Sequence, residues 1–103
     1  MEPIKEVKLV HPEAVWDCAE AHGFHTTSDG VTRSFLEEMA LIISEIGEAI
    51  QAYRHNEPVD EELADVYLRL ADTCHARGVD LAREVYVKHQ YNLTRPFLHG
   101  KRC

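Results

Sequence analysis

Two pairs of carboxylates are the first feature of this sequence whose spacing suggests chemistry. Glu45 and Glu48 are three positions apart, and so are Glu62 and Asp65. Residues at this spacing share one face of an α-helix, so each pair presents its two carboxylates on the same side. Because the connection between the two segments is short, their helices should lie side by side and bring the pairs together. The sequence therefore predicts a cluster of four carboxylates.

Such a cluster favours a hard divalent cation. Two like charges about 4 Å apart repel by roughly 1 kcal/mol in water and by about 4 kcal/mol at an effective dielectric of 20. Oxygen ligands without Cys or His are typical of Mg²⁺, with Mn²⁺ as a substitute. Such an ion takes phosphate oxygens as further ligands, which points to phosphoryl chemistry with a water nucleophile. The alternative is that these Glu residues only form exposed helix surfaces, where pairs at this spacing are common.

The surroundings of the first pair favour a packed position. Glu45 and Glu48 lie in the apolar stretch from Ile42 to Ile50, with Gly47 between them. A glycine inside a helix is destabilising by roughly 0.5–1 kcal/mol relative to alanine. We therefore expect a close contact with another helix at Gly47.

Four helices are predicted to position these residues, and no β-strand pattern of useful length is present. The helices run from His11-Pro12 to about His22, from Ser34 to about His55, from Pro58 or Asp60 to Arg77, and from Asp80 to about Thr94. Ser34 and Glu37 fit a capping box, and Pro96 prevents continuation of the last helix. The predicted fold class is all-α, a four-helix bundle-like protomer with antiparallel central helices, in a single domain over residues 1–103.

The second predicted helix is apolar on more than one side. Its expected buried face has apolar residues at spacings of three and four, namely Phe35, Met39, Ile43, Ile46, Ile50 and Tyr53. Further apolar residues lie off that face, namely Leu41, Ile42, Ala49 and Ala52. A helix of this kind is either central or shared with another subunit, so the sequence predicts a homo-oligomer.

Length, charge and composition exclude several classes of protein. The 103 residues suit one domain, and a net charge of −7 disfavours a nucleic acid duplex as the main partner. No stretch approaches the roughly 18–20 apolar residues of a membrane span. The three cysteines and seven histidines match no zinc or redox spacing, and we assign none of them to a metal. We expect a soluble cytoplasmic protein that binds neither a duplex nor a membrane.

Basic residues could meet phosphates from two places in the chain. Arg69 shares a polar stripe of the third helix with Glu62 and Asp65, and it is either a phosphate contact or part of a structural ion pair. No acidic residue follows Glu84. The end of the chain is instead basic, with Lys88, Arg95, Lys101 and Arg102. This end either contacts phosphates or is a solvated tail.

The two acidic segments resemble those of the MazG-like all-α nucleoside triphosphate pyrophosphohydrolases. Ser44-Glu45-Ile46-Gly47-Glu48 is similar to the family's E-E-x-x-E element, with Ser44 in place of the leading Glu. Glu62 and Asp65 match its E-x-x-D element. The segment from Lys88 to Lys101 is similar to the C-terminal element of compact, single-domain members. The resemblance covers roughly residues 35–101.

The resemblance implies Mg²⁺-dependent hydrolysis between the α and β phosphates, giving a nucleoside monophosphate and pyrophosphate, typically to clean the nucleotide pool. It implies that Glu45, Glu48, Glu62 and Asp65 hold the metal and carry the catalysis. By analogy, Lys88, Asn92 and Arg95 contact phosphate or sugar, with Arg69 as a further candidate. It also implies a homodimer or a dimer of dimers. The alternatives are a phosphoribosyl-ATP pyrophosphatase-like enzyme and a non-catalytic helical oligomeric interaction module.

Overall fold

The computed structural model describes residues 4, 6–26, 30 and 32–96, and it confirms the all-α class. The helices are α1 (Pro12–Ala21), α2 (Phe35–Arg54), α3 (Asp60–Ala76) and α4 (Leu81–Leu93). In these described ranges, β-type pairing is limited to one isolated bridge between Thr26 and Thr32, in the loop before α2. No helix within the same ranges has both the length and the apolar composition that a membrane span requires.

Local contacts explain where the helices begin and end. The Ser34 side chain accepts a hydrogen bond from the Glu37 N–H, and the Glu37 carboxylate accepts one from the Ser34 N–H at 3.1 Å. The predicted capping box is therefore confirmed. Asp80 caps α4 by accepting from the Arg83 N–H at 3.1 Å. Gly78, with a φ of 72°, ends α3, because glycine adopts this left-handed conformation without a steric penalty.

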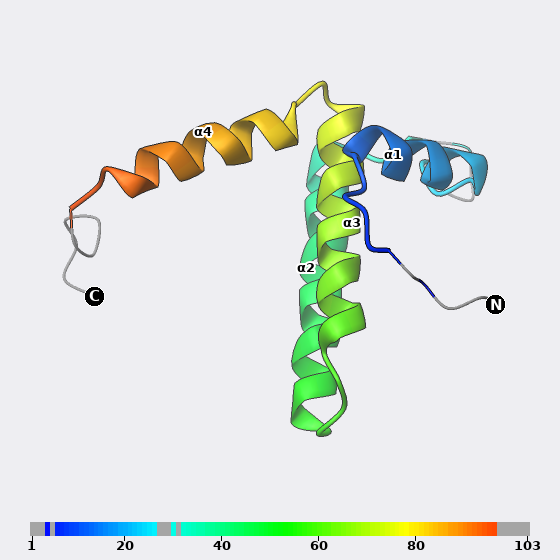
Figure 1. Ribbon diagram of the computed structural model, residues 1–103. Coiled ribbons are helices and arrows are strands. Elements are labelled where there is room, and N and C mark those ends of the chain that lie inside the picture. The colour runs from blue at the N-terminus through cyan, green and yellow to red at the C-terminus, as the bar shows by residue number, and fades with distance from the viewer. Residues whose placement is uncertain (1–3, 5, 27–29, 31, 97–103) are drawn as a thin grey trace.

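The long helices α2 and α3 lie side by side and are joined by a short connection at one end (Figure 1). Near the other end of the pair, α1 packs against α3. The last helix, α4, leads away from this group and makes few contacts with α3 (Figure 1). One chain therefore forms a three-helix body with a projecting helical arm.

The face of α2 that was predicted to be buried is exposed in the single chain. Ile43 is 67% exposed and Tyr53 is 77% exposed. A different side of α2 faces α3, because Glu38 and Glu45, seven positions apart on α2, bond Thr73 and Arg69 of α3. Ala52, seven positions further along α2, is buried. The prediction chose the wrong side, because both sides are apolar and α3 can cover only one of them.

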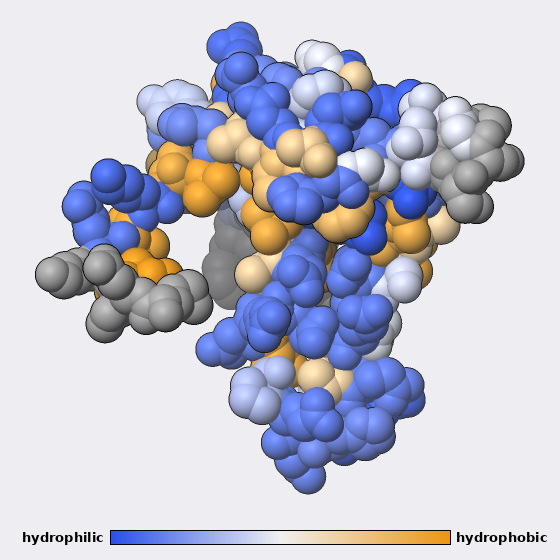
Figure 2. Space-filling model, turned by 90° about the vertical axis from the view of Figure 1, so that its right-hand side faces the viewer, coloured by the Kyte–Doolittle hydropathy of each residue, from blue (hydrophilic) through white to orange (hydrophobic). Residues whose placement is uncertain are grey.

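The core of the single chain is small. Of the residues that the structure describes, only Ala52, Ala71 and Thr73 are buried. In the face shown in Figure 2, hydrophobic residues reach the surface over the upper part of the molecule, whereas the lower end is mainly hydrophilic. The radius of gyration is 16.7 Å, against about 13 Å for a compact domain of about 100 residues. The single chain therefore leaves much of its apolar surface in contact with water.

Candidate metal centre

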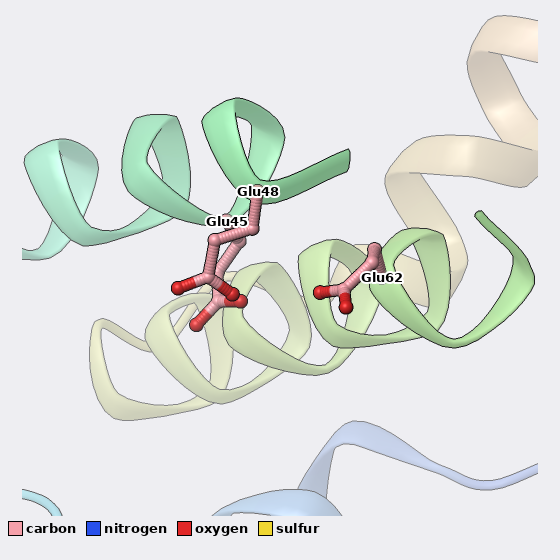
Figure 3. Close-up of side chains that lie close together, drawn as sticks. All are labelled: Glu45, Glu48 and Glu62. Carbon is pink, nitrogen blue, oxygen red and sulfur yellow. The ribbon is translucent and has the colours of Figure 1, made fainter. Parts of the chain in front are cut away.

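Three of the four predicted carboxylates meet between α2 and α3. Glu45 and Glu48 extend from α2 and Glu62 extends from α3 (Figure 3), and one oxygen of each lies within 4.8 Å of the other two. Glu45 and Glu62 are half-buried, while Glu48 is exposed. We call these three residues the glutamate cluster. It is accessible to solvent at Glu48, so a ligand can reach it without moving a helix.

Asp65, the fourth predicted member, lies outside the group of three oxygens. It is half-buried, and it comes almost one helical turn after Glu62 on α3. An aspartate side chain is also one methylene shorter than that of a glutamate. Its negative charge still contributes to the raised pKa of Glu62, so Asp65 lies near the cluster without being part of it.

The pKa of Glu62 is raised above its ordinary value, and the causes describe the site. Partial desolvation is the largest cause, followed by the negative charges of Glu48, Asp65, Glu61 and Glu45. Without a cation, the ionised form of Glu62 is therefore disfavoured. A divalent cation would remove this penalty, and carboxylate oxygens are the ligands that Mg²⁺ prefers. The cluster therefore offers the type of donor that Mg²⁺ takes, with one oxygen of each carboxylate within 4.8 Å of the other two.

Two polar contacts set the register of α2 against α3. Arg69 on α3 donates from Nε to Oε1 of Glu45 at 3.1 Å. Further along the helix pair, the Thr73 hydroxyl donates to Oε2 of Glu38 at 2.7 Å. Of the two interpretations of Arg69, the structure shows the ion pair. The partner is Glu45 of the cluster, so Arg69 stands at the edge of the candidate site.

A hollow of about 530 Å³ adjoins the glutamate cluster. Its lining consists of Ser44, Gly47, Glu48, Gln51, Ala52, His55, Glu57 and Glu62. The expected close helix contact at Gly47 is wrong for the single chain, because a Cβ added there would meet nothing within 4 Å. Gly47 instead leaves space beside Glu48.

The structure adds residues to the site that the two motifs did not indicate. Gln51 of α2 and His55, which directly follows α2, line the hollow beyond the end of the first acidic element. Gln51 follows Glu48 by three positions and His55 follows it by seven, so helical periodicity carries the motif's face forward to both. Continuing the helical spacing beyond Glu48 could therefore have identified Gln51 and His55 from the sequence.

The three predicted substrate contacts, two on α4 and Arg95 just after it, are not brought to the cluster within one chain, because α4 projects away (Figure 1). Nζ of Lys88 lies 5.1 Å from the ring centroid of Tyr91, and Cζ of Arg95 lies 5.4 Å from the same centroid. The side-chain oxygen of Asn92 is shielded from solvent and accepts no hydrogen bond from the described residues. The segment His99-Gly100-Lys101, which extended the resemblance, lies outside the described residues.

Neutralising Glu62 is expected to stabilise the metal-free protein. At pH 7 the ionised Glu62 faces other carboxylates, so Glu62→Gln removes repulsion and should raise the melting temperature without Mg²⁺. Because the folded-state pKa of Glu62 is raised, this gain shrinks as the pH falls through that pKa and the wild-type carboxyl is protonated. The same variant should lose most of the stabilisation by Mg²⁺ that we expect of the wild type.

Thermal unfolding at pH 7 and at about pH 4, with and without Mg²⁺, measures all of these effects. Glu61→Gln is the matched control, because it also removes a charge that raises the pKa of Glu62 but is not one of the three carboxylates of the cluster. It should keep the Mg²⁺ response. A Glu62→Gln protein with an unchanged melting temperature and a full Mg²⁺ response would contradict the metal centre.

Comparisons with known proteins did not identify a family. No family model matches the chain, and no curated protein or solved structure matches it either. A function for this chain therefore has to be inferred from its residues and from where the helices place them.

Proposed function

We propose that this protein is a Mg²⁺-dependent nucleoside triphosphate pyrophosphohydrolase, which releases pyrophosphate and a nucleoside monophosphate and helps to clean the nucleotide pool. The observation that carries the proposal is the glutamate cluster. Its oxygens lie within 4.8 Å of one another and come from two helices whose acidic elements resemble those of MazG-like enzymes. Glu45, Glu48 and Glu62 would hold the metal, with Asp65 as a further ligand.

In the proposed reaction, the side chains of the site have separate roles. When bound, Mg²⁺ supplies positive charge that neutralises the triphosphate and favours attack by water. One carboxylate of the cluster accepts a proton from the attacking water. The oxygen of the water forms a bond to phosphorus, and the bridging P–O bond to the pyrophosphate leaving group breaks. Arg69 donates to Glu45 through Nε, and its guanidinium carries further N–H groups that can donate to phosphate. The adjoining hollow, with Gln51 and His55 in its wall, would receive part of the nucleotide.

The active assembly proposed here is a homodimer, or a dimer of dimers, in which α4 of one protomer lies on the α2–α3 pair of another. The antiparallel α2 and α3 helices would then be the centre of a bundle that two chains complete. Apolar exposure supports this arrangement. Tyr91 and Leu93 on α4 are 56% and 66% exposed, and Ile43 on α2 is 67% exposed. Joining these surfaces would remove both from water.

Charge supports the same assembly. From Val85 to Pro96 the chain contains no acidic residue, while Lys88 and Arg95 lie on one face of that segment. The surface around the glutamate cluster is acidic. A basic helix with apolar side chains is complementary to it, and docking would bring Lys88, Asn92 and Arg95 towards the phosphates of a bound nucleotide.

A nucleotide panel tests the proposed reaction. Ordinary dNTPs and NTPs, modified nucleotides and phosphoribosyl-ATP are incubated with the protein, and pyrophosphate release is measured with and without Mg²⁺. We expect release that depends on Mg²⁺, with Mn²⁺ as a substitute. Turnover of phosphoribosyl-ATP alone would assign the related enzyme. No turnover on the panel, together with no rise in melting temperature on adding metal, would favour a non-catalytic interaction module.

A further inference from the structure

His25, in the loop after α1, is held between two carboxylates from two different helices. Its Nδ1 lies 2.5 Å from Oε2 of Glu20 on α1. Its Nε2 lies 2.7 Å and 3.0 Å from the two carboxylate oxygens of Asp72 on α3. The imidazole stacks on Trp16 of α1, with ring centroids 4.9 Å apart. The His25 and Asp72 side chains are only 14% and 16% exposed, so the contact between them is largely shielded from solvent.

This arrangement requires a particular protonation state. An ionised carboxylate only accepts hydrogen bonds, so each ring nitrogen must donate in order to bond its partner. Both nitrogens carry protons only in the imidazolium form. In neutral imidazole, one nitrogen presents a lone pair, which would face the lone pairs of a carboxylate. The two carboxylates approach different ring nitrogens, so the three residues form a bridge and not a chelating site.

The bridge adds a charged contact to the packing of α1 against α3. No residue of α1 is buried, although Val15, Trp16 and Ala19 are half-buried. The loop between α1 and α2 also holds a hydrogen bond of its own, in which the Arg33 guanidinium donates to the carbonyl oxygen of Phe24. The bridge, which is exposed at Glu20 and shielded at the His25–Asp72 contact, therefore supplements the packing that holds α1 and this loop against α3.

We propose that His25 is a pH-sensitive clasp, whose doubly protonated ring joins Glu20 of α1 to Asp72 of α3 and whose deprotonation loosens α1 and the following loop from α3. The clasp residues are distinct from the glutamate cluster, so the proposal stands independently of the proposed activity. It predicts that the docking of α1 responds to pH in the range where histidine titrates, whereas Glu62 between α2 and α3 responds in the carboxylate range.

The pKa of His25 agrees with this geometry. Partial burial of the ring lowers its pKa, but the hydrogen bonds to Glu20 and Asp72 and the charges of both carboxylates outweigh burial, so the pKa is raised. Other charged or titratable groups surround the clasp. Arg33 contacts Phe24, Glu38 accepts from Thr73 next to Asp72, and the ring centroid of His75 lies 5.7 Å from that of Trp16.

The sign of the pH dependence follows from a raised folded-state pKa. The stabilisation is fully present below the unfolded-state pKa of about 6.5 and is lost as the pH rises through the folded value. The clasp therefore closes on the acidic side of neutrality and opens towards alkaline pH. At a pH low enough to protonate Glu20 and Asp72, both carboxylates would lose their negative charge. The bridge would then weaken because of the carboxylates and not because of His25.

Trp16, the only tryptophan of the chain, provides a local probe of the clasp. Its fluorescence and the melting temperature are followed from about pH 6 to about pH 8, a range in which histidine is the main titrating side chain. We expect a fluorescence transition with a midpoint above about 6.5 and a melting temperature that falls across it. His25→Gln should remove the transition and lower the melting temperature at the acid end. Asp72→Asn should move the midpoint to lower pH.

Two controls separate the clasp from other histidines. His75→Gln should keep the transition, although His75 also lies beside Trp16, and His89→Gln on α4 should leave both signals unchanged. If His25→Gln does not fold, NMR titration of His25 in the wild type and in Asp72→Asn still measures the midpoint. The proposal is overturned if His25 titrates at or below its ordinary pKa, or if the transition persists in His25→Gln.

Discussion

Replacing Glu48 with glutamine is expected to reduce Mg²⁺-dependent pyrophosphate release by at least about 100-fold, the lower end of what a positioned acid–base group contributes. Glu48 is the exposed member of the glutamate cluster, and it lines the adjoining hollow. Glutamine keeps the size of the side chain but removes the negative charge that would attract the cation and the basicity that would accept a proton. The loss should appear in kcat at saturating Mg²⁺.

The loss of activity in this variant should not be accompanied by a loss of stability. Because Glu48 is one of the charges that disfavour ionised Glu62, the Glu48→Gln protein should melt no lower than the wild type without metal. Glu61→Gln is again the matched control and should keep most of the activity. A Glu48→Gln protein with near wild-type turnover would remove the cluster from the reaction, whereas equal losses in both variants would indicate a general effect of charge.

Two variants with reduced activity are expected to restore activity when they are combined in one dimer. Lys88→Ala should lower kcat/KM by about 10- to 100-fold, because a hydrogen bond to a charged group contributes roughly 1.5–3 kcal/mol. In a mixed dimer, one chain carries Glu48→Gln and the other carries Lys88→Ala. If each site takes its glutamate cluster from one chain and α4 from the other, one site contains both substitutions and the other site contains neither. Co-expression of the two chains, followed by the pyrophosphate assay, measures the recovery.

The expected recovery follows from symmetry. With random pairing, about half of the dimers are mixed and one of the two sites in each is intact, so activity should return to about a quarter of the wild-type value. Glu48→Gln combined with Glu62→Gln is the matched control. Both defects lie in the carboxylate half of the site, so their mixed dimers contain no intact site. If Glu48→Gln with Lys88→Ala recovers no more activity than this control, the proposed exchange of α4 is wrong.

The elements of this fold could be predicted from the sequence, because their signals are local. Ser34 and Glu37 form a capping box within one helical turn, and Asp80 and Gly78 mark helix ends through their own hydrogen bonds and dihedral angles. The pairing of Glu45 with Glu48 on one face likewise follows from helical periodicity alone. Such features depend on residues a few positions apart, so one sequence contains everything that is needed to predict them.

Side-chain partners across helices could not be predicted in the same way. The side of α2 that faces α3, the ion pair of Arg69 with Glu45 and the separation of Asp65 from the glutamate cluster all depend on the register between two helices. That register is set jointly by many contacts, among them Thr73 with Glu38. Both sides of α2 are apolar, so periodicity alone did not distinguish them.

By itself, the sequence determined that this protein is helical, where its helices begin and end, and that acidic pairs lie on two of them. Only the tertiary structure decided which three carboxylates meet, that α4 leads its basic residues away, and that His25 joins Glu20 to Asp72, a residue 47 positions away. The physical reason is range: hydrogen bonds within a helix link neighbours in the chain, whereas packing depends on how whole helices fit together.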